Sequence, residues 1–228
     1  MNQVGGHGNH SVSSRYRRNV ASRQEADQYL VVCEGQTEQA YCLFLNRCLG
    51  SKVVVKPMRD RPDVVQMVEL ARQYHEGDPR RGIQAGRYKE VWVVFDWDDH
   101  TDRVREAQKL ATRYGVKMAL SNPSFEAWLI WHFDDYYSIG CFPDDCLRRI
   151  TKHLPSYCKG KDFDFTVLLG EGRTRQACDR ADSARDKHRR EGRCFPDDRP
   201  SSDLDHLIKV LVDAWQIGNP GEICPLMS

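Results

Sequence analysis

The chain has 228 residues, 40% of them hydrophobic, and its 34 Lys and Arg residues nearly balance 33 Asp and Glu residues to a formal net charge of +1. That length allows one large domain with an ample core. No apolar run approaches the ~20 residues that span a bilayer, and residues 1–14 lack the apolar centre of a signal peptide, so we expect a cytoplasmic protein without a membrane segment.

Hydrophobic periodicity predicts four strand–helix units in succession. Residues 1–28 are rich in Gly, Ser and Arg and have no periodicity, so we expect a flexible basic tail. The predicted strands are 29–33, 52–56, 90–95 and 117–120. The helices that follow them are 37–49, 62–74, 101–114 and 123–133, the last with Asn122 as its cap and Pro123 at its first position. Beyond residue 134 the pattern predicts helices at 143–153, 174–190 and 204–215.

This alternation predicts an α/β fold in which helices flank a mainly parallel sheet, with a helical C-terminal appendage. We divide the chain into the tail at 1–28, a core at 29–133 and a helical region at 134–228 that packs on the core. The sequence shows no internal repeats.

The most informative stretch is 91–100, where five apolar residues end at a cluster of carboxylates. Such a run is typical of a strand buried on both faces, and open α/β sheets bind ligands at the C-terminal ends of their strands. Asp96 and Asp98 point the same way on an extended chain and can share one cation. Glu34 follows the first strand directly, so neighbouring strands would bring it to the same crevice. These oxygens form the incomplete cage that Mg²⁺ prefers, which suits phosphodiester cleavage.

Other acidic positions have more than one interpretation. Glu126 lies one turn into the helix after Pro123, and is either a further metal ligand or an acid that complements the helix dipole. Asp99 and His100 are expected to cap or to support the ligands. Asp203 and Asp205 repeat the Asp-x-Asp spacing, but they follow two serines at a helix start, so capping and dipole complementation explain them.

The nine cysteines are odd in number and show no Cys-x-x-Cys spacing, so we expect reduced thiols. A zinc site can be assembled on paper from residues of the C-terminal region, but their spacing fits no zinc finger. These residues are Cys141, Cys146, His153 and Cys158.

Basic residues are concentrated in 172–193, which contains eight positively charged and four acidic side chains. The segment is either a solvated charged face or a surface that grips phosphates beside an acidic centre. The candidate nucleic-acid contacts are Arg173, Arg175, Arg185, Arg189 and Arg190.

Three motifs resemble the RloB-like family, a branch of the Toprim fold. They are Leu30-Val-Val-Cys-Glu34-Gly35-x-Thr37-Glu38, Val91-x-x-Val-Phe95-Asp96-x-Asp98-x-His100 and Ser121-Asn122-Pro123-Ser124-Phe125-Glu126-x-Trp128-Leu129. The segment 200–212 is similar to the family's C-terminal helix, so the resemblance covers about residues 29–215. The family usually has Glu or Lys after the acidic glycine turn, where this chain has Gln36.

The resemblance implies a Toprim catalytic centre, with Glu34 as acid/base or ligand and Asp96 and Asp98 as ligands of Mg²⁺, for which Mn²⁺ can substitute. It also implies a place in antiphage defence or restriction beside a partner ATPase. We therefore expect an endonuclease that cleaves DNA or tRNA as the effector of such a system. Because the chain has no Gly-x-x-x-x-Gly-Lys-Ser/Thr sequence, we do not expect it to hydrolyse ATP itself.

Two other functions stay open at this point. One is a catalytically silent nucleic-acid-binding or regulatory subunit that keeps the acidic pocket for structure. The other is a different Mg²⁺-dependent phosphoryl transfer on nucleotides. The sequence also leaves open whether the chain forms an oligomer.

Overall fold

A computed structural model describes residues 28–228 apart from 51, 59–62, 98–100, 138–141 and 162. The predicted basic tail lies outside the described residues except for Gln28. Four residues named in the sequence analysis lie outside them too: Asp98, Asp99, His100 and Cys141.

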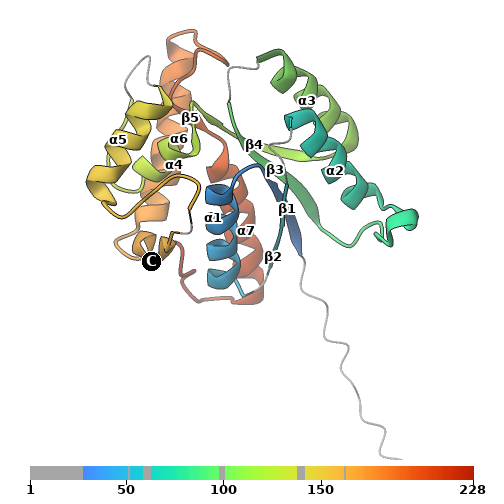
Figure 1. Cartoon of the computed structure of the whole chain (residues 1–228). Coiled ribbons are helices and arrows are strands. Elements are labelled where there is room, and N and C mark those ends of the chain that lie inside the picture. Colours follow the sequence, from blue (N-terminus) through green and yellow to red (C-terminus); the bar gives the residue numbers. More distant parts are fainter. Residues whose placement is uncertain (1–27, 51, 59–62, 98–100, 138–141, 162) are drawn as a thin grey trace, which may run out of the picture.

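The described elements alternate between strands and helices through the first half of the chain (Figure 1). They are β1 (Tyr29–Cys33), α1 (Gln36–Cys48), β2 (Val53–Pro57), α2 (Val64–Glu76), the 3₁₀ helix η1 (Pro79–Arg81), β3 (Glu90–Asp96), α3 (Thr101–Tyr114) and β4 (Lys117–Asn122). The second half is mostly helical, with α4 (Phe125–Ile130), α5 (Pro143–His153), η2 (Phe165–Leu168), α6 (Arg173–Arg190), β5 (Ser201–Ser202) and α7 (Leu204–Gly218).

The strands form one sheet in the order β2-β1-β3-β4-β5. The first four pair in parallel, and β5 pairs antiparallel with β4. The predicted α/β fold with a mainly parallel sheet is therefore confirmed. β5 was not predicted, because a pair of serines carries no hydrophobic signal and joins the sheet only through its contact with β4.

Side chains of the sheet alternate between two hydrophobic cores, one on each face. In β1, Leu30 and Val32 pack with residues of α2 and α3. Tyr29, Val31 and Cys33 face the opposite way and pack with residues of α1, α4, α6 and α7. Figure 1 shows α2 and α3 on one side of the sheet and the other helices on the far side, so the molecule has three layers.

The residues after 134 close one face of the sheet. The apolar side of α7, from Leu204 to Leu211, is fully buried in the same core as β1 and α1. Trp128 and Trp131 lie in this core as well, with no exposed surface. The sheet, the helices of the first half of the chain and the C-terminal helices thus pack together as one structure.

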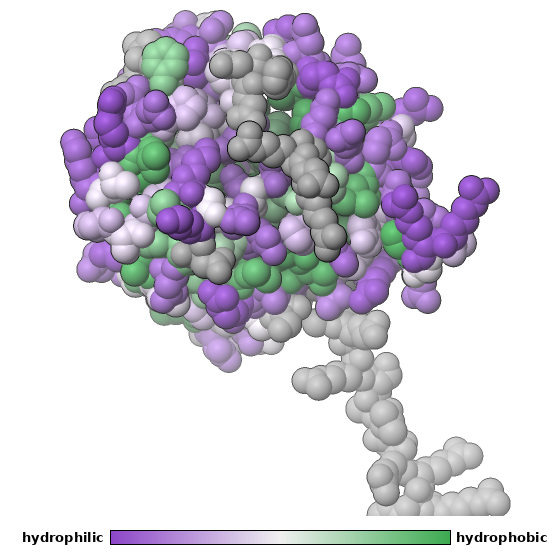
Figure 2. Space-filling view, in the orientation of Figure 1, coloured by the Kyte–Doolittle hydropathy of each residue, from purple (hydrophilic) through white to green (hydrophobic). Residues whose placement is uncertain are grey.

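Hydrophilic side chains cover the rim of the face that Figure 2 shows, and hydrophobic residues lie in smaller patches between them. None of the helices in the described part of the chain combines the length and apolar character needed to cross a membrane.

The junction between β4 and α4 differs from the prediction. Asn122 is the last residue of β4 rather than a helix cap, Ser124 takes the N-cap position, and α4 ends at Ile130 rather than at 133. The Asn122 side chain instead donates hydrogen bonds to Pro196 O at 3.1 Å and to Asp198 at 2.7 Å. Asn122 therefore holds the loop before β5, a contact that no local pattern signals.

Asp203 and Asp205 lie at the start of α7, as predicted, but the side-chain cap predicted there is not formed. Asp203 is at the N-cap of α7, but its side chain accepts a hydrogen bond from Leu120 N–H at 3.4 Å instead of capping the helix. Asp205 is fully buried and accepts hydrogen bonds from both terminal nitrogens of Arg185 at 2.8 and 2.6 Å. Arg185 also donates to Ser202 O, so this buried pair ties α6 to β5 and α7.

The Arg185–Asp205 pair generates a prediction about stability. Removing one partner of a buried ion pair costs about 3–5 kcal/mol, because it leaves the other charge buried. We expect Arg185→Ala to lower the free energy of unfolding by about 3 kcal/mol, the lower end of that range, since Lys209 still contacts Asp205 at 3.1 Å. Urea denaturation measures the loss.

The matched control is Arg189→Ala on the same helix. The Arg189 side chain is 77% exposed and pairs with Asp186 one turn away, so we expect a loss of at most about 0.5 kcal/mol. Equal losses in the two variants would contradict the structural role of Arg185.

Candidate functional site

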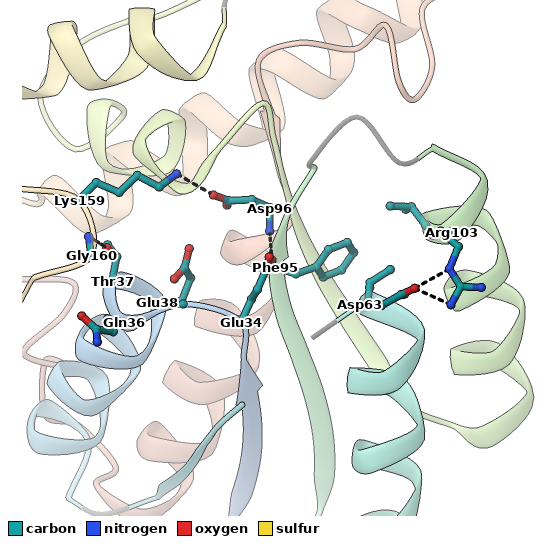
Figure 3. Close-up of a pocket in the computed structure, with 13 residues that line it drawn as sticks. Glu34, Gln36, Thr37, Glu38, Asp63, Phe95, Asp96, Arg103, Lys159 and Gly160 are labelled. Atoms are coloured by element: carbon teal, nitrogen blue, oxygen red, sulfur yellow. Dashed lines mark hydrogen bonds and ion pairs between the residues drawn. The ribbon is translucent and has the colours of Figure 1, made fainter. Parts of the chain in front are cut away.

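A cavity of about 700 Å³ opens at the C-terminal edge of the sheet, beside the ends of β1 and β3 (Figure 3). This is the edge at which open α/β sheets bind their ligands. Its charged lining residues are Glu34, Glu38, Asp63, Asp96, Arg103 and Lys159. In Figure 3 Asp63 and Arg103 lie on one side of β3, and the other charged residues lie on the opposite side.

Glu34 and Asp96 meet because β1 and β3 are adjacent parallel strands. The Asp96 N–H donates a hydrogen bond to Glu34 Oε2 at 3.1 Å, and the Glu34 N–H donates to Val94 O at 3.2 Å. The structure thus brings together two of the three carboxylates that the sequence predicts as the catalytic set. The third, Asp98, lies outside the described residues.

Glu38 is a carboxylate of the cavity that was not predicted as a site residue. It lies in the first turn of α1, and only 4% of it is exposed. A Cβ added to Gly35 would lie 2.4 Å from Glu38 Oε2. Gly35 therefore leaves the space that the Glu38 carboxylate fills. The signal in the sequence was the position of Glu38, three residues after Gly35 in the first of the three motifs.

Glu126 reaches the same cluster from α4 and has no exposed surface. The ammonium group of Lys159 lies 3.5 Å from Glu126 Oε2 and 3.3 Å from Asp96 Oδ2. One cation therefore bridges two buried carboxylates from different elements. Nothing in the sequence around Lys159 indicates this contact, because the residue follows no strand and lies on no helix.

The loop that carries Lys159 is fixed on both sides. The Tyr157 hydroxyl donates a hydrogen bond to Glu126 Oε1 at 2.8 Å. The Gly160 N–H donates to Thr37 Oγ1 in the first turn of α1 at 3.0 Å. The loop after α5 is thereby held between α4 and α1, and Lys159 is placed over the cavity (Figure 3).

The electrostatics of the cluster are dominated by burial and by like charges. Burial raises the pKa of Asp96 well above its ordinary value, and Glu38, Glu126 and Glu34 raise it further, whereas Lys159 opposes the shift. Burial disfavours the charged form of Lys159, but Asp96 and Glu126 outweigh that effect and raise its pKa. A cation added to the cluster would relieve repulsion that a single ammonium group leaves in place.

Two carboxylate oxygens of the cluster suit a metal ion. Asp96 Oδ1 and Glu126 Oε2 are buried and accept no hydrogen bond from the described residues, although Glu126 Oε2 lies in an ion pair with Lys159 at 3.5 Å. A buried oxygen without a donor is costly, and a divalent cation would satisfy it. The available donors are carboxylate oxygens, which match Mg²⁺ and Mn²⁺. The residues present therefore fit the predicted ion.

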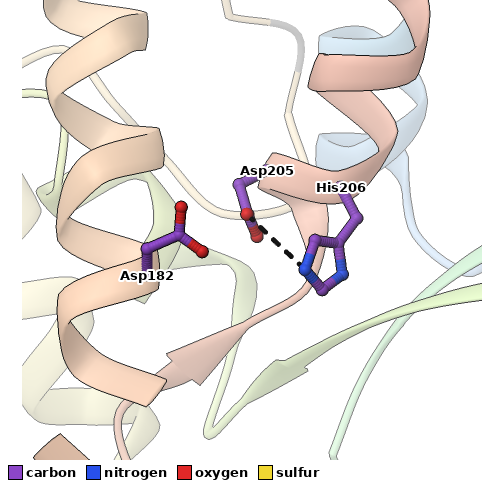
Figure 4. Close-up of side chains that lie close together, drawn as sticks. All are labelled: Asp182, Asp205 and His206. Carbon is purple, nitrogen blue, oxygen red and sulfur yellow. Dashed lines mark ion pairs between the residues drawn. The ribbon is translucent and has the colours of Figure 1, made fainter. Parts of the chain in front are cut away.

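A tighter group of possible ligands in the described part of the chain lies elsewhere, between α6 and α7 (Figure 4). It consists of Asp182, Asp205 and His206. Arg185 and Lys209 each contact both aspartates, so protein cations already neutralise this group. We assign no metal to it.

The five arginines predicted to contact nucleic acid all lie on α6 and do not line the cavity. Arg185 is bound to the buried Asp205 and so has little capacity for a phosphate. Arg173 and Arg175 donate to backbone carbonyls of Val167 and Met227. Arg189 and Arg190 are exposed. For all five, contact with nucleic acid stays a prediction.

A model of the protein family described as RloB-like protein matches residues 29–211 of the chain. The match begins at β1, ends within α7 and contains every carboxylate of the cluster. No curated protein and no solved structure matches the chain.

The cavity generates a prediction about metal binding. If Asp96 and Glu126 help to hold a divalent cation, Mn²⁺ should stabilise the folded protein, by about 2.7 kcal/mol at a concentration 100-fold above the dissociation constant. Asp96→Asn removes a charge at an oxygen without a donor, so it should lose most of this stabilisation. Thermal melting with and without Mn²⁺ measures the effect.

Asp63→Asn is the matched control, because Asp63 lines the same cavity but pairs with Arg103 at 2.5 Å. We expect this variant to keep the stabilisation by Mn²⁺. Equal shifts of the melting temperature in the wild type and in Asp96→Asn would show that no ion binds at Asp96.

Proposed function

The chain belongs to the RloB-like family, and we propose that it is a Mg²⁺-dependent endonuclease of the Toprim type that cleaves phosphodiester bonds in nucleic acid. The observation that carries the proposal is the meeting of Glu34, Glu38 and Asp96 in one cavity, where Lys159 joins Asp96 to the buried Glu126 of α4. Two buried oxygens of this cluster, Asp96 Oδ1 and Glu126 Oε2, accept no hydrogen bond from the described residues, which supports a role as metal ligands, and the second of them is in an ion pair with Lys159.

Glu34, Glu38, Asp96 and Glu126 are the described residues that would hold Mg²⁺, and Asp98 is a further candidate because it follows Asp96 by two residues. Bound Mg²⁺ or Mn²⁺ would supply a Lewis acid for the phosphate and a water of lowered pKa. Glu34 lies at the partly exposed edge of the sheet, so we propose it as the group that takes up a proton or completes the ligand set.

Lys159 is the cation that the chain itself supplies to the site. Its side chain is 46% exposed although its ammonium group contacts buried carboxylates, so it can also reach a bound substrate. A positive charge at that position would stabilise the negative charge that develops on the phosphate during cleavage. Tyr157 and Gly160 hold the loop that presents it.

We propose DNA or tRNA as the substrate and antiphage defence or restriction as the setting, with the chain as cytoplasmic effector of a partner ATPase. The resemblance of three motifs to the RloB-like family supports this setting. The chain has no Walker A sequence, which is consistent with a partner that hydrolyses ATP.

The Lys159 bridge also favours a second candidate function. An ammonium group between Asp96 and Glu126 stabilises the acidic cluster without any metal, as a catalytically silent nucleic-acid-binding or regulatory subunit would require. The endonuclease would cleave nucleic acid in the presence of a divalent ion, whereas the silent subunit would not cleave it under any condition.

Incubation of the protein with plasmid DNA, and separately with total tRNA, distinguishes them. We expect cleavage with Mg²⁺ or Mn²⁺ and none with EDTA. Glu34→Gln should lower the rate of cleavage by about 100-fold or more, because it removes the carboxylate that we propose to take up a proton or to complete the ligand set. Its melting temperature should change little, since Glu34 is partly exposed.

Glu69→Gln on the outer surface of α2 controls for loss of one negative charge, and its activity should match the wild type. Cleavage that persists in EDTA, or equally in Glu34→Gln, would refute the metal-dependent mechanism. No cleavage of either substrate under any condition would favour the silent subunit.

A separate prediction concerns Lys159. Lys159→Met should abolish most of the cleavage but keep the stabilisation by Mn²⁺, because every carboxylate ligand remains. Lys159→Arg keeps the charge and should recover part of the rate. If the Met variant also loses Mn²⁺ binding, Lys159 positions the carboxylates rather than the phosphate.

A further inference from the structure

A second cavity, of about 570 Å³, adjoins the acidic one along α1. We propose that it binds a nucleotide next to the scissile phosphate of a single-stranded nucleic acid. This inference rests on the proposed function and names the form of its substrate. We call the cavity the α1 groove, and its polar, charged and aromatic lining residues are Gln36, Gln39, Arg47, Lys161 and Phe163.

The α1 groove lies next to the acidic cavity. Gln36 and Gly160 line both of them. Gly160 directly follows Lys159, whose ammonium group bridges Asp96 and Glu126. A chain whose phosphate lies at Lys159 would therefore place its neighbouring nucleotide past Gly160 and in the α1 groove.

The charge of the α1 groove is opposite to that of the acidic cavity. Arg47 and Lys161 are both exposed and line it. The nearby Asp164 carboxylate accepts hydrogen bonds from the Thr166 N–H at 3.0 Å and hydroxyl at 2.9 Å, and these bonds, together with the charge of Arg47, lower its pKa. Two cations beside an acidic centre match a phosphate backbone that approaches a metal-binding cluster.

Phe163 gives the α1 groove an aromatic surface. Its ring is partly exposed and lies edge-on to Tyr157 at 5.4 Å and to Phe165 at 5.1 Å between ring centroids. These contacts fix the ring, and a fixed aromatic ring is the platform on which single-stranded nucleic acids stack their bases. Bases inside a duplex are already stacked, so this feature favours an unpaired strand or loop.

The test is the binding of fluorescein-labelled 12-nucleotide oligo(dT) and oligo(U) to the full chain in EDTA, followed by fluorescence anisotropy. Phe163→Leu should weaken binding about tenfold, because a stacked base contributes roughly 1–3 kcal/mol. Arg47→Gln with Lys161→Gln should weaken binding and reduce the slope of log K against log salt by about 1.4, which corresponds to two lost phosphate contacts.

Arg113→Gln with Lys117→Gln removes the same charge from the end of α3 and the start of β4, at the opposite edge of the sheet. This control should bind like the wild type. The proposal is overturned if the Arg47/Lys161 variant keeps the wild-type affinity and slope, if the control loses as much, or if the wild type binds duplexes but no single strands.

Because the titration is done in EDTA, it is independent of cleavage. A protein that binds single strands through the α1 groove but never cuts them in Mg²⁺ would refute the nuclease and keep the groove. A protein that cuts nucleic acid, with groove variants that bind normally, would refute the groove alone. Since Arg47 and Lys161 are exposed, their variants test the proposal even if Phe163→Leu unfolds the chain.

Discussion

Repulsion among carboxylates at one edge of the sheet is the constraint on which the rest of the site depends. Glu34, Glu38, Asp96 and Glu126 gather there, and burial in a cavity of low dielectric strengthens their repulsion. The raised pKa of Asp96 is the direct result. The protein offsets part of the repulsion with Lys159, which the C-terminal half of the chain supplies. The region after residue 134 therefore completes the acidic edge as well as covering the sheet.

Most of the fold could be predicted, because buried apolar runs leave few arrangements. The runs at β1 and β3 have apolar residues on both faces, so they belong in the middle of a covered parallel sheet, where they are neighbours. The errors fall where tertiary contacts decide the structure. Asn122 looks like a helix cap but holds a distant loop, and Asp205 is the expected first-turn acid of α7 but is also buried against Arg185.

The site could be predicted as far as it follows from strand ends. Glu34 follows one buried strand and Asp96 ends the next one in the sheet, and parallel pairing brings such residues together without further information. Glu38 and Lys159 depend on details that a pattern does not carry. Glu38 needs the space that Gly35 leaves, and Lys159 lies 63 positions after Asp96 in a loop placed by Tyr157.

The basic residues show why charge in a sequence is a weak guide to a binding surface. The α6 segment has the highest density of arginines, yet Arg185 is used to neutralise a buried aspartate, and Arg189 pairs with Asp186 on the same helix. Neither Arg47 nor Lys161 belongs to a basic cluster in the sequence, but the fold places both in the groove beside the acidic cavity. A phosphate is bound by positive side chains that are not already paired with carboxylates, and these must lie close to the carboxylate cluster to place the phosphate there. By that criterion the α1 groove is better placed than α6 to hold a substrate.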